Sequence, residues 1–491
     1  MKKYLQLIDV RWESILGARK VEFHQSKALL ALLGFVFSVV AFYPGFMSAD
    51  SLDQYSQSHT LKFNDWHPPI MAWLWSKLNL VIDGPQSLLF LQLSMLWGGL
   101  FLLCRNLSGG RFTILCILVG FFPWIVNFEG VLWKDVGMAF SLLLALAILT
   151  TNKLTNYKLV AVSFLLLYAF MLRGNAPAAL PPIVWFALWK TFPMQSNRMR
   201  LLATVPILML MFVFSYVFTY KVLDTYKAHP EILILTDDLV HLSVSSNRSL
   251  LPKAQLELLK ECKDETIAGG KEVGKMSCLI IKSSYGKAIS YEVLTGIDKQ
   301  AWISAVASNP LEYLKFRLDA YMFLLRSPSV SPYYVWQPGI NPNDVGLEHD
   351  DNAATKILEQ YVSKAVQLVP FFFKPYWWLI SALLIMAGTF VLQGNRDSII
   401  LIRVLLTSAI LYMLSYIPLT LAADFRYVYW SVLAISLAGM VFVTSDLKLA
   451  KWKRISPYET YKRINWLFWV RRINASKTSS LRCTLSINEH R

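Results

Sequence analysis

The chain has 491 residues, of which 55% are hydrophobic and 16% are charged, and its mean hydropathy is +0.42. Soluble globular proteins carry about 25% charged residues, so this composition excludes an ordinary soluble enzyme and predicts a polytopic, all-α membrane protein. The net charge of +16 does not indicate a nucleic-acid partner, because the basic residues gather in the termini and in alternate short loops.

The amino-terminal part of the chain predicts seven membrane spans. Residues 1–27 are polar and basic, and we place them in the cytoplasm. Apolar runs near 20 residues, the length that crosses about 30 Å of hydrocarbon, follow at about 28–48, 86–104, 112–127, 136–151, 159–172, 176–189 and 201–220. Residues 68–81 are apolar but short and rich in tryptophan, which predicts a helix lying at the membrane interface.

Residues 221–370 form one polar domain, in which acids and bases nearly balance, and this balance favours an extracytoplasmic location. Asn309 as N-cap, Pro310 at the first position and Glu312 in the capping-box position predict a helix start. The predicted apolar face of that helix consists of Leu311, Leu314, Leu318, Tyr321 and Leu325. Another helix is predicted near 252–265, and 327–352 should be loop.

Three further spans are predicted at about 371–392, 399–421 and 428–444, followed by a basic tail, 445–491. Within the tail, 461–473 is aromatic and basic, which is typical of a helix on anionic lipid headgroups; an untethered tail is the alternative. Ten spans place both termini in the cytoplasm. The predicted organisation is a membrane module, 1–220, with an outer loop at 49–85, then the domain 221–370, a second membrane module, 371–444, and the tail.

The sequence allows one disulfide but does not decide whether it forms. Cys262 and Cys278 both fall in the large outer loop and can pair if that loop faces an oxidising periplasm, although both could equally be free thiols. No Cys/His spacing predicts a zinc site. We predict no cofactor, and a divalent metal has no support in the sequence.

Charged residues recur at the predicted outer ends of the spans, where ionisable groups are costly and are functional candidates. The acids are Asp50, Asp53, Asp65, Glu129, Asp135 and Asp424, and the bases are Lys134, Arg173 and Arg426. Transfer of a sugar from a lipid phosphate needs both signs of charge. A carboxylate takes the proton of the acceptor hydroxyl, and cations hold the departing phosphate.

Each candidate has a structural alternative. Asp50 could only cap a helix, Asp53 could be a solvated acid, and Asp65 could cap the interfacial helix. His67, before two prolines, favours a structural role over metal binding. Lys134 and Arg173 could snorkel toward the interface, and Asp424 could pair with Arg426. The run 348–351 (Glu-His-Asp-Asp) favours a solvated loop over a metal cluster.

The stretch 43–69, with Asp50, Asp53 and the run Asn64-Asp-Trp-His-Pro-Pro69, resembles the first outer loop of the GT-C superfamily of membrane glycosyltransferases. That resemblance puts Asp50 in the position of the catalytic carboxylate and implies a polyprenyl-phosphate sugar donor. Further local runs are similar to a bacterial branch of the superfamily: Leu132-Trp-Lys-Asp135, Leu172-Arg-Gly-Asn175, Asn309-Pro-Leu-Glu-Tyr-Leu-Lys315 and Asp424-Phe-Arg-Tyr427.

Size, span number and the large outer loop also resemble the phage-borne O-antigen glucosyltransferases, which implies transfer of glucose from undecaprenyl phosphate to O-antigen in the periplasm. The first outer loop lacks the paired Asp-Glu of protein mannosyltransferases, which argues against a protein acceptor.

The sequence therefore predicts an inner-membrane hexosyltransferase with its active site facing the periplasm. Asp50 is the predicted base, Asp53 or Asp65 assists, and Lys134, Arg173 and Arg426 bind the donor phosphate. Two other functions stay open: an O-antigen ligase or polymerase, and a lipid-linked sugar flippase or transporter. The predicted partners are the undecaprenyl-phosphate sugar, a glycan acceptor such as a lipopolysaccharide intermediate, and the bilayer.

Overall fold

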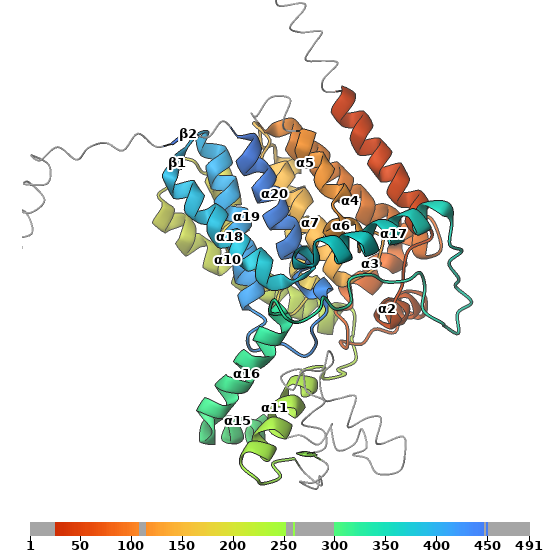
Figure 1. The fold of residues 1–491 in the computed structure, drawn as a ribbon, viewed down its shortest axis with the longest axis vertical. Helices are drawn as coiled ribbons and strands as arrows, with labels where there is room; N and C mark the ends of the chain where they lie inside the picture. The colour runs from red at the N-terminus through yellow and green to blue at the C-terminus, as the bar shows by residue number, and fades with distance from the viewer. Residues whose placement is uncertain (1–24, 108–113, 252–258, 261–298, 446–447, 450–491) are drawn as a thin grey trace, which may run out of the picture. The chain divides into compact units, whose positions relative to one another are not determined.

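The computed structural model describes residues 25–107, 114–251, 259–260, 299–445 and 448–449, which are helical over most of their length (Figure 1). The chain divides into two compact units, Met1–Phe390 with Gly394–Leu447 and Val391–Gln393 with Lys448–Arg491. Within the second unit, β1 (Leu392–Gln393) pairs antiparallel with β2 (Lys448–Leu449). All other elements below belong to the first unit.

Five helices of the described part are long and apolar enough to cross a membrane: Gln25–Phe42, Pro85–Asn106 (α4), Asn197–Val222 (α10, Asn197–Val217, with η4, Phe218–Val222), Arg396–Leu414 (α19) and Phe425–Thr444 (η7, Phe425–Val428, with α20, Tyr429–Thr444). Shorter apolar helices are α8 (Asn156–Leu172) and α18 (Pro375–Val391), the latter preceded by η6 (Pro370–Phe373). The number of ten spans and the orientation of the termini stay predictions.

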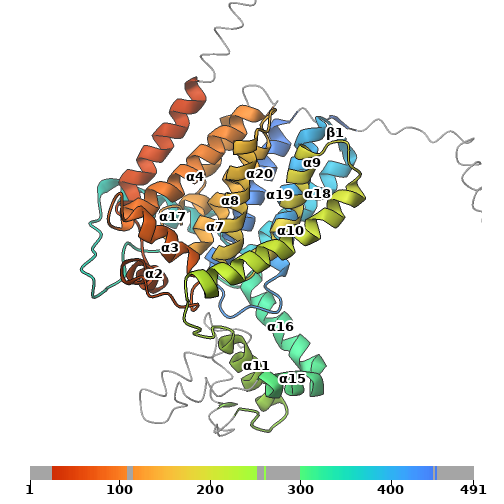
Figure 2. The ribbon, with the colours of Figure 1, turned by 180° about the vertical axis from the view of Figure 1, so that it is seen from behind.

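The core of the first unit is a helix bundle around α7 (Lys134–Leu149), which is buried on nearly all sides. Helix α7 packs against α4, α8 and α20, and α20 packs against α19 (Figures 1 and 2). Beyond α19 lie η3 (Ala176–Ala178) and α9 (Leu180–Thr191), and α10 packs against α9. Buried aromatic side chains, among them Trp133 and Trp430, fill the space between these helices.

The predicted span at 112–127 is not a single helix. The described residues there form α5 (Leu115–Leu118), η2 (Val119–Phe121) and α6 (Pro123–Val126). Phe122 is extended, with φ −63° and ψ 136°, because a proline disfavours the helical conformation in the residue before it. Hydropathy alone therefore predicted a continuous helix where Pro123 interrupts it.

The segment 49–85, the predicted first outer loop, contains two helices, of which one was predicted. Helix α3 (Ile70–Leu78) agrees with the short helix expected at 68–81, and α2 (Ala49–Thr60) was missed because its sequence is polar. A hydrogen bond from Gln57 Nε2 to Asp53 Oδ2 and one from Asn64 N to Gln57 Oε1 stabilise α2 and its connection to the following loop.

The region 221–370 contains α11 (Ile232–Ser245), α15 (Lys299–Ser308), α16 (Pro310–Leu325) and α17 (Ala353–Leu368), and 327–352 contains no helix, as predicted. Residue Cys262, residue Cys278, most of the predicted helix at 252–265 and the run 461–473 lie outside the described residues.

Helix α16 begins at Pro310 as predicted, but its predicted apolar face was right only in part. Tyr321 and Leu325 are buried as expected. Leu311, Leu314 and Leu318 are exposed, and Phe316 and Arg317 are buried in their place. Buried Arg317 forms an ion pair with Asp238 on α11, with 2.7 Å between Nε and Oδ1, and its Nη1 donates to the carbonyl of Thr420 at 3.1 Å. This ion pair orients α16, a constraint that apolar periodicity does not encode. The Asn309 side chain donates to the carbonyl of Ala305 rather than capping the helix.

Candidate functional site

The chain segment that leads into α2 is fixed on both sides by backbone hydrogen bonds. Phe46 accepts from and donates to the segment 130–132, and Met47 does the same with 339–341, at distances of 2.9 to 3.0 Å. Both side chains are fully buried. The segment therefore holds the start of α2 in one place, and Asp50 lies in the first turn of that helix.

The side chains around the start of α2 add to this rigidity. The Trp133 indole donates to Ser48 Oγ at 2.8 Å, and Ser51 Oγ donates to the carbonyl of Leu132 at 2.8 Å. The positive end of the helix dipole favours a carboxylate in the first turn. Asp50 is thus placed by neighbours that make no direct contact with its carboxylate.

Asp50 is paired with an arginine that arrives from 376 residues further along the chain. Arg426 Nη1 donates to Asp50 Oδ2 at 2.9 Å, and Arg426 Nε donates to Asp424 Oδ2 at 3.0 Å. The guanidinium also lies 4.5 Å from the centre of a Trp133 ring and 5.4 Å from that of Tyr427. One arginine thus links two carboxylates and packs between aromatic rings. The Asp424–Arg426 pair, which the sequence offered as a structural alternative, is present, and Asp50 joins it.

His67 lies between Asp50 and Lys134. Lys134 Nζ is 2.7 Å from His67 Nδ1, and His67 Nε2 is 3.8 Å from Asp50 Oδ1. Burial and the neighbouring Lys134 cation lower the pKa of His67 to about 3, so the ring is neutral at pH 7. Because Lys134 donates to Nδ1, the ring proton belongs on Nε2, which faces the Asp50 carboxylate.

Lys134 is the cation of this cluster that has no acid partner: within the described part of the chain, no carboxylate oxygen lies within 4.0 Å of its Nζ. Burial, together with Arg173, lowers its pKa to about 8, partly offset by Asp50 and Asp135. The ammonium is therefore still mostly protonated at pH 7. A buried cation that is held only by a neutral imidazole is suited to bind an anion.

Burial alone would raise the pKa of Asp50, but Arg426, Lys134 and His67 outweigh that effect and lower it to about 2. Asp53 lies one helical turn along α2, and its pKa is raised by burial, with a further contribution from Asp50. Its carboxylate accepts from Gln57 at 2.7 Å. The two acids therefore share a neighbourhood, and only Asp50 is paired with the cations.

Arg173 completes the cluster from the end of α8. Its Nη1 donates to Asp135 Oδ1 and its Nε donates to Asn175 Oδ1. The guanidinium lies 5.1 Å from the centre of the Tyr427 ring, which is the ring that also contacts Arg426. The structure thus brings Lys134, Arg173 and Arg426 together from three distant parts of the sequence.

Asp65 has a different environment from Asp50. Its carboxylate accepts from the Tyr220 hydroxyl at 2.8 Å and from the backbone N–H of Ala228, and its own N–H donates to the carbonyl of Tyr226. Both carboxylate oxygens are occupied by groups that fasten the loop to the chain after α10. A catalytic role for Asp65 remains an untested prediction, and its contacts favour a structural one.

The structure also shows the surroundings of two other candidates from the sequence, Glu129 and His349. Glu129 is fully buried, and burial raises its pKa to about 8, so it is protonated at pH 7. His349 Nδ1 lies 2.9 Å from the Tyr43 carbonyl oxygen and Nε2 lies 3.5 Å from Asp351. Among the described residues, no group of three or more His, Cys, Asp or Glu side chains could hold a metal ion.

The described part of the chain also contains an apolar groove of about 330 Å³. It is lined by α3, α4, α8 and α10, through residues such as Trp73, Met95, Phe164 and Phe214. Tyr168, at the inner wall, packs against α7 at Gly137, where an added Cβ would lie 3.7 Å from the tyrosine oxygen. Gly137 is about one helical turn from Lys134. One residue that lines the groove, Tyr168, therefore lies against the helix that carries Lys134.

The sequence did not single out His67 or the aromatic residues Trp133 and Tyr427 as parts of the site. The placement of His67 beside Lys134 depends on contacts between residues 67 positions apart. Its position before two prolines favoured only a structural role. A signal was present in the Trp133-Lys134 and Arg426-Tyr427 dipeptides, since an aromatic beside a cation at a membrane boundary is suited to cation–π packing.

Comparison with known protein families and with curated proteins finds no match to this chain. The structure is similar to crystal structures of the Archaeoglobus fulgidus oligosaccharyltransferase in the apo form (12% identity, TM-score 0.39) and in complex with zinc and sulfate (13% identity, TM-score 0.36). The aligned region covers 84% and 83% of this chain but only 50% and 48% of theirs. The chain thus spans about half the length of that protein, and a similarity at this level does not identify its activity.

Proposed function

We propose that the chain is a membrane glycosyltransferase of the GT-C type. It transfers a hexosyl unit, with glucose as the first candidate, from undecaprenyl phosphate to O-antigen or another cell-surface glycan on the periplasmic face of the inner membrane. The observation that carries this proposal is the arrangement of Asp50 opposite Arg426 and Lys134, with an apolar groove that contacts the helix carrying Lys134. A lipid-linked phosphate presents an apolar chain and an anion at the same place.

The groove between α3, α4, α8 and α10 takes the first part of the polyprenyl chain, because it is lined almost entirely by apolar atoms. From there the phosphate reaches Lys134, which binds it as a point charge. Arg426 and Arg173 supply planar donors that suit phosphate oxygens. As the bond from the sugar C1 to the phosphate oxygen breaks, these cations stabilise the charge that develops on the phosphate.

Asp50 is the general base. In the free protein it is a weak one, because the cations that will hold the phosphate lower its pKa to about 2. When a phosphate competes for Arg426 and Lys134, Asp50 loses part of that stabilisation and its pKa rises toward the ordinary range of a carboxyl group. Donor binding thus makes Asp50 more basic at the moment when an acceptor hydroxyl has to be deprotonated.

The reaction balances as a direct displacement. The acceptor hydroxyl gives its proton to Asp50 while its oxygen forms a bond to C1 of the sugar, and undecaprenyl phosphate leaves on the opposite side. This geometry inverts the anomeric centre. Asp53, one turn along α2, assists because its negative charge favours movement of the hydroxyl proton toward Asp50. The domain 221–370 recognises the acceptor glycan.

The test supplies membranes containing the full chain with radiolabelled undecaprenyl-phosphate sugars and follows the label into glycan. Wild type should label one glycan, and Asp50→Asn should not. Asp83→Asn is the matched control, because this acid lies in the same predicted outer segment and its mostly exposed side chain pairs with His59. Equal transfer by wild type and Asp50→Asn contradicts the proposal.

The same membranes separate the alternative functions. Retained transfer by Asp50→Asn, with loss on substitution of His or Arg residues in the large loop, indicates a ligase or polymerase. Movement of the labelled lipid across sealed vesicles, without a new glycosidic bond, indicates a transporter.

A further inference from the structure

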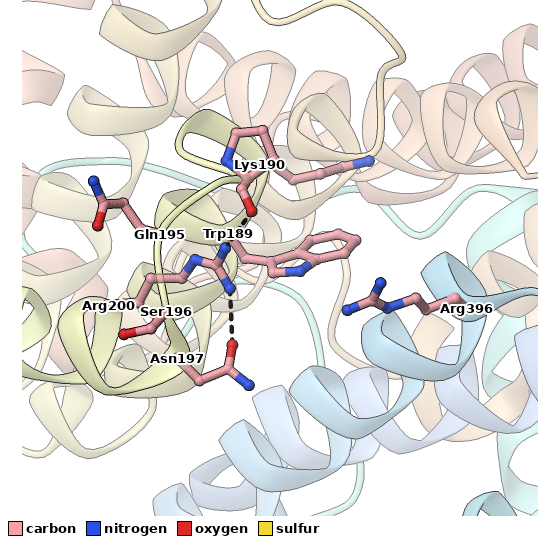
Figure 3. A pocket seen from close by; sticks show the side chains of 8 residues that line it. Trp189, Lys190, Gln195, Ser196, Asn197, Arg200 and Arg396 are labelled. Atoms are coloured by element: carbon pink, nitrogen blue, oxygen red, sulfur yellow. Dashed lines mark hydrogen bonds between the residues drawn. The ribbon is translucent and has the colours of Figure 1, made fainter.

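A polar cavity of about 460 Å³ lies where α9 ends and α10 and α19 begin (Figure 3). This is the far end of α19 from the candidate site, because Ser415 at the other end of α19 accepts a hydrogen bond from Asn175, two residues after Arg173. Nineteen residues of helix span about 28 Å at 1.5 Å per residue. The cavity and the candidate site are therefore separated by about the thickness of a bilayer's hydrocarbon core.

Three basic side chains from three helices line this cavity, and no acid does: Lys190 from the end of α9, Arg200 from the first turns of α10 and Arg396 from the start of α19 (Figure 3). Lys190 Nζ lies 3.2 Å from Asp397, whose side chain is 60% exposed. For Arg396, the described residues offer no carboxylate within 4.0 Å. The cavity thus has an excess of positive charge.

The buried side chain of Arg200 distinguishes this cavity from a patch of solvated surface charges. It is buried, with 5% of its surface exposed. Its Nη1 donates to Asn197 Oδ1 at 2.8 Å and its Nη2 donates to the carbonyls of Phe192 and Pro193 at 3.1 and 2.8 Å. These bonds fix the guanidinium, yet its buried Nε has no hydrogen-bond acceptor in the described part of the chain. An unsatisfied buried donor on a cation is costly unless an anion completes it.

The local backbone favours an anion as well. Ser196 caps α10 by accepting from the backbone N–H of Met199, and Asn395 caps α19 by accepting from that of Asp397. Both helices therefore direct their positive dipole ends toward the cavity. A phosphate group is the anion that suits this site, because its oxygens accept hydrogen bonds both from a guanidinium and from the N–H groups at a helix N-terminus.

The surroundings indicate that the anion belongs to a lipid. Helix α10 exposes a long apolar surface that includes Leu201, Val205 and Met209, and only 6% of its 18 most apolar consecutive residues are buried. Trp189 lies at the cavity, with Lys190 Nζ 5.4 Å from its ring centre. Tryptophan and lysine together are typical of the headgroup level of a membrane. Acyl chains packed along α10 would bring their headgroup directly to the cavity.

We propose that this cavity binds the phosphate of an anionic phospholipid, at the membrane surface opposite to the candidate active site. Basic pockets between membrane helices are suited to such headgroups. Lys190, Arg200 and Arg396 hold the phosphate oxygens, and the acyl chains lie against α10. This assignment rests on the cavity alone and does not depend on the proposed transfer reaction.

The experiment uses the purified full chain in nanodiscs of phosphatidylcholine with or without phosphatidylglycerol, and measures bound lipid by native mass spectrometry. Three proteins are compared: wild type, Lys190→Gln with Arg396→Gln, and a control with Lys153→Gln and Arg105→Gln. The control removes the same charge from two exposed residues outside the cavity. Arg200→Gln is left for a second step, because its three hydrogen bonds stabilise the turn before α10.

Wild type and control should retain phosphatidylglycerol, and the cavity variant should bind it about tenfold more weakly, as expected for the loss of charge-assisted hydrogen bonds. Equal weakening in the control would overturn the proposal, since it would reflect net charge only. Inorganic phosphate is added to wild type in pure phosphatidylcholine. If phosphate at millimolar concentration raises the thermal stability as much as phosphatidylglycerol does, the cavity binds a soluble anion and the lipid assignment is wrong.

Discussion

The two ends of α19 carry two clusters of basic residues that differ in what surrounds them. At one end, Arg426 and Arg173 are paired with carboxylates and packed on aromatic rings, and Lys134 is held by a neutral histidine. At the other end, Arg200 is fixed by backbone carbonyls and an amide, and Asp397, the acid that pairs with Lys190, is exposed. In the roles proposed above, the first cluster exchanges one anion for another during a reaction, and the second holds one anion.

The largest expected effect on sugar transfer is at Asp50, because the cluster of Lys190, Arg200 and Arg396 has no equivalent buried acid among the described residues. Asp50→Asn should lower kcat/KM for sugar transfer by about 10³-fold, because a general base contributes 10²- to 10⁴-fold. The measurement is transfer of radiolabelled sugar with the variant matched for expression. Lys190→Gln with Arg396→Gln should change the same rate by less than twofold. A comparable loss in both variants would break the distinction between the two ends.

Lys134 should be the next most sensitive position, because it is the candidate phosphate ligand without an acid partner. Lys134→Gln should lower kcat/KM by about 30-fold, in the range expected for losing a charge-assisted bond to phosphate. Lys134→Arg should recover part of this loss. Kinetics with varied donor concentration measure both. If the glutamine variant transfers as well as the arginine variant, positive charge at this position is not needed.

The pH dependence should separate the acid from the cation. The pKa of Asp50 is about 2 in the free protein, so kcat/KM should not fall through its protonation between pH 7 and about pH 4. The pKa of Lys134 is about 8, so kcat/KM should decline above that pH as the ammonium loses its proton. Lys134→Arg should remove the alkaline decline, because a guanidinium stays charged. An unchanged alkaline limb in that variant would assign the limb to another group.

The smallest effect on transfer is expected at Asp65. Asp65→Asn keeps one acceptor and weakens the bonds to Tyr220 and Ala228, which should lower stability by about 1 kcal/mol. Thermal unfolding in detergent measures this change, and transfer should stay within about threefold of wild type. A loss of transfer as large as that of Asp50→Asn, at unchanged stability, would restore Asp65 as a catalytic candidate.

Much of the helical layout could be predicted from hydropathy, and α4 agrees with its predicted span within about two residues. The failures have physical causes. Periodicity cannot say whether an apolar face meets the core or the surroundings, so Leu311 and Leu314 of α16 were assigned to the wrong side. Polar α2 has no apolar run to reveal it, and its position depends on bonds to 130–132 and 339–341.

For the site, the pattern of charge at the predicted ends of spans selected Asp50, Lys134, Arg173 and Arg426, and the structure places these four residues together; their catalytic and phosphate-binding roles stay predictions. Sequence could not decide which acid meets which cation. Asp50 and Asp65 are fifteen positions apart in the same loop, yet one pairs with Arg426 and the other with Tyr220. That difference arises from tertiary contacts, which neither residue type nor spacing encodes.

The extended segment at Phe46 and Met47 has a consequence for biogenesis. Asp50 is translated early, but the backbone partners that fix its helix lie at 130–132 and 339–341, and its arginine lies at position 426. His67 and Lys134 are translated early as well, but a ribosome must finish most of the chain before Asp50 can pair with Arg426. Nascent fragments released before residue 426 would carry the carboxylate without its arginine, so premature termination should yield inserted but inactive protein.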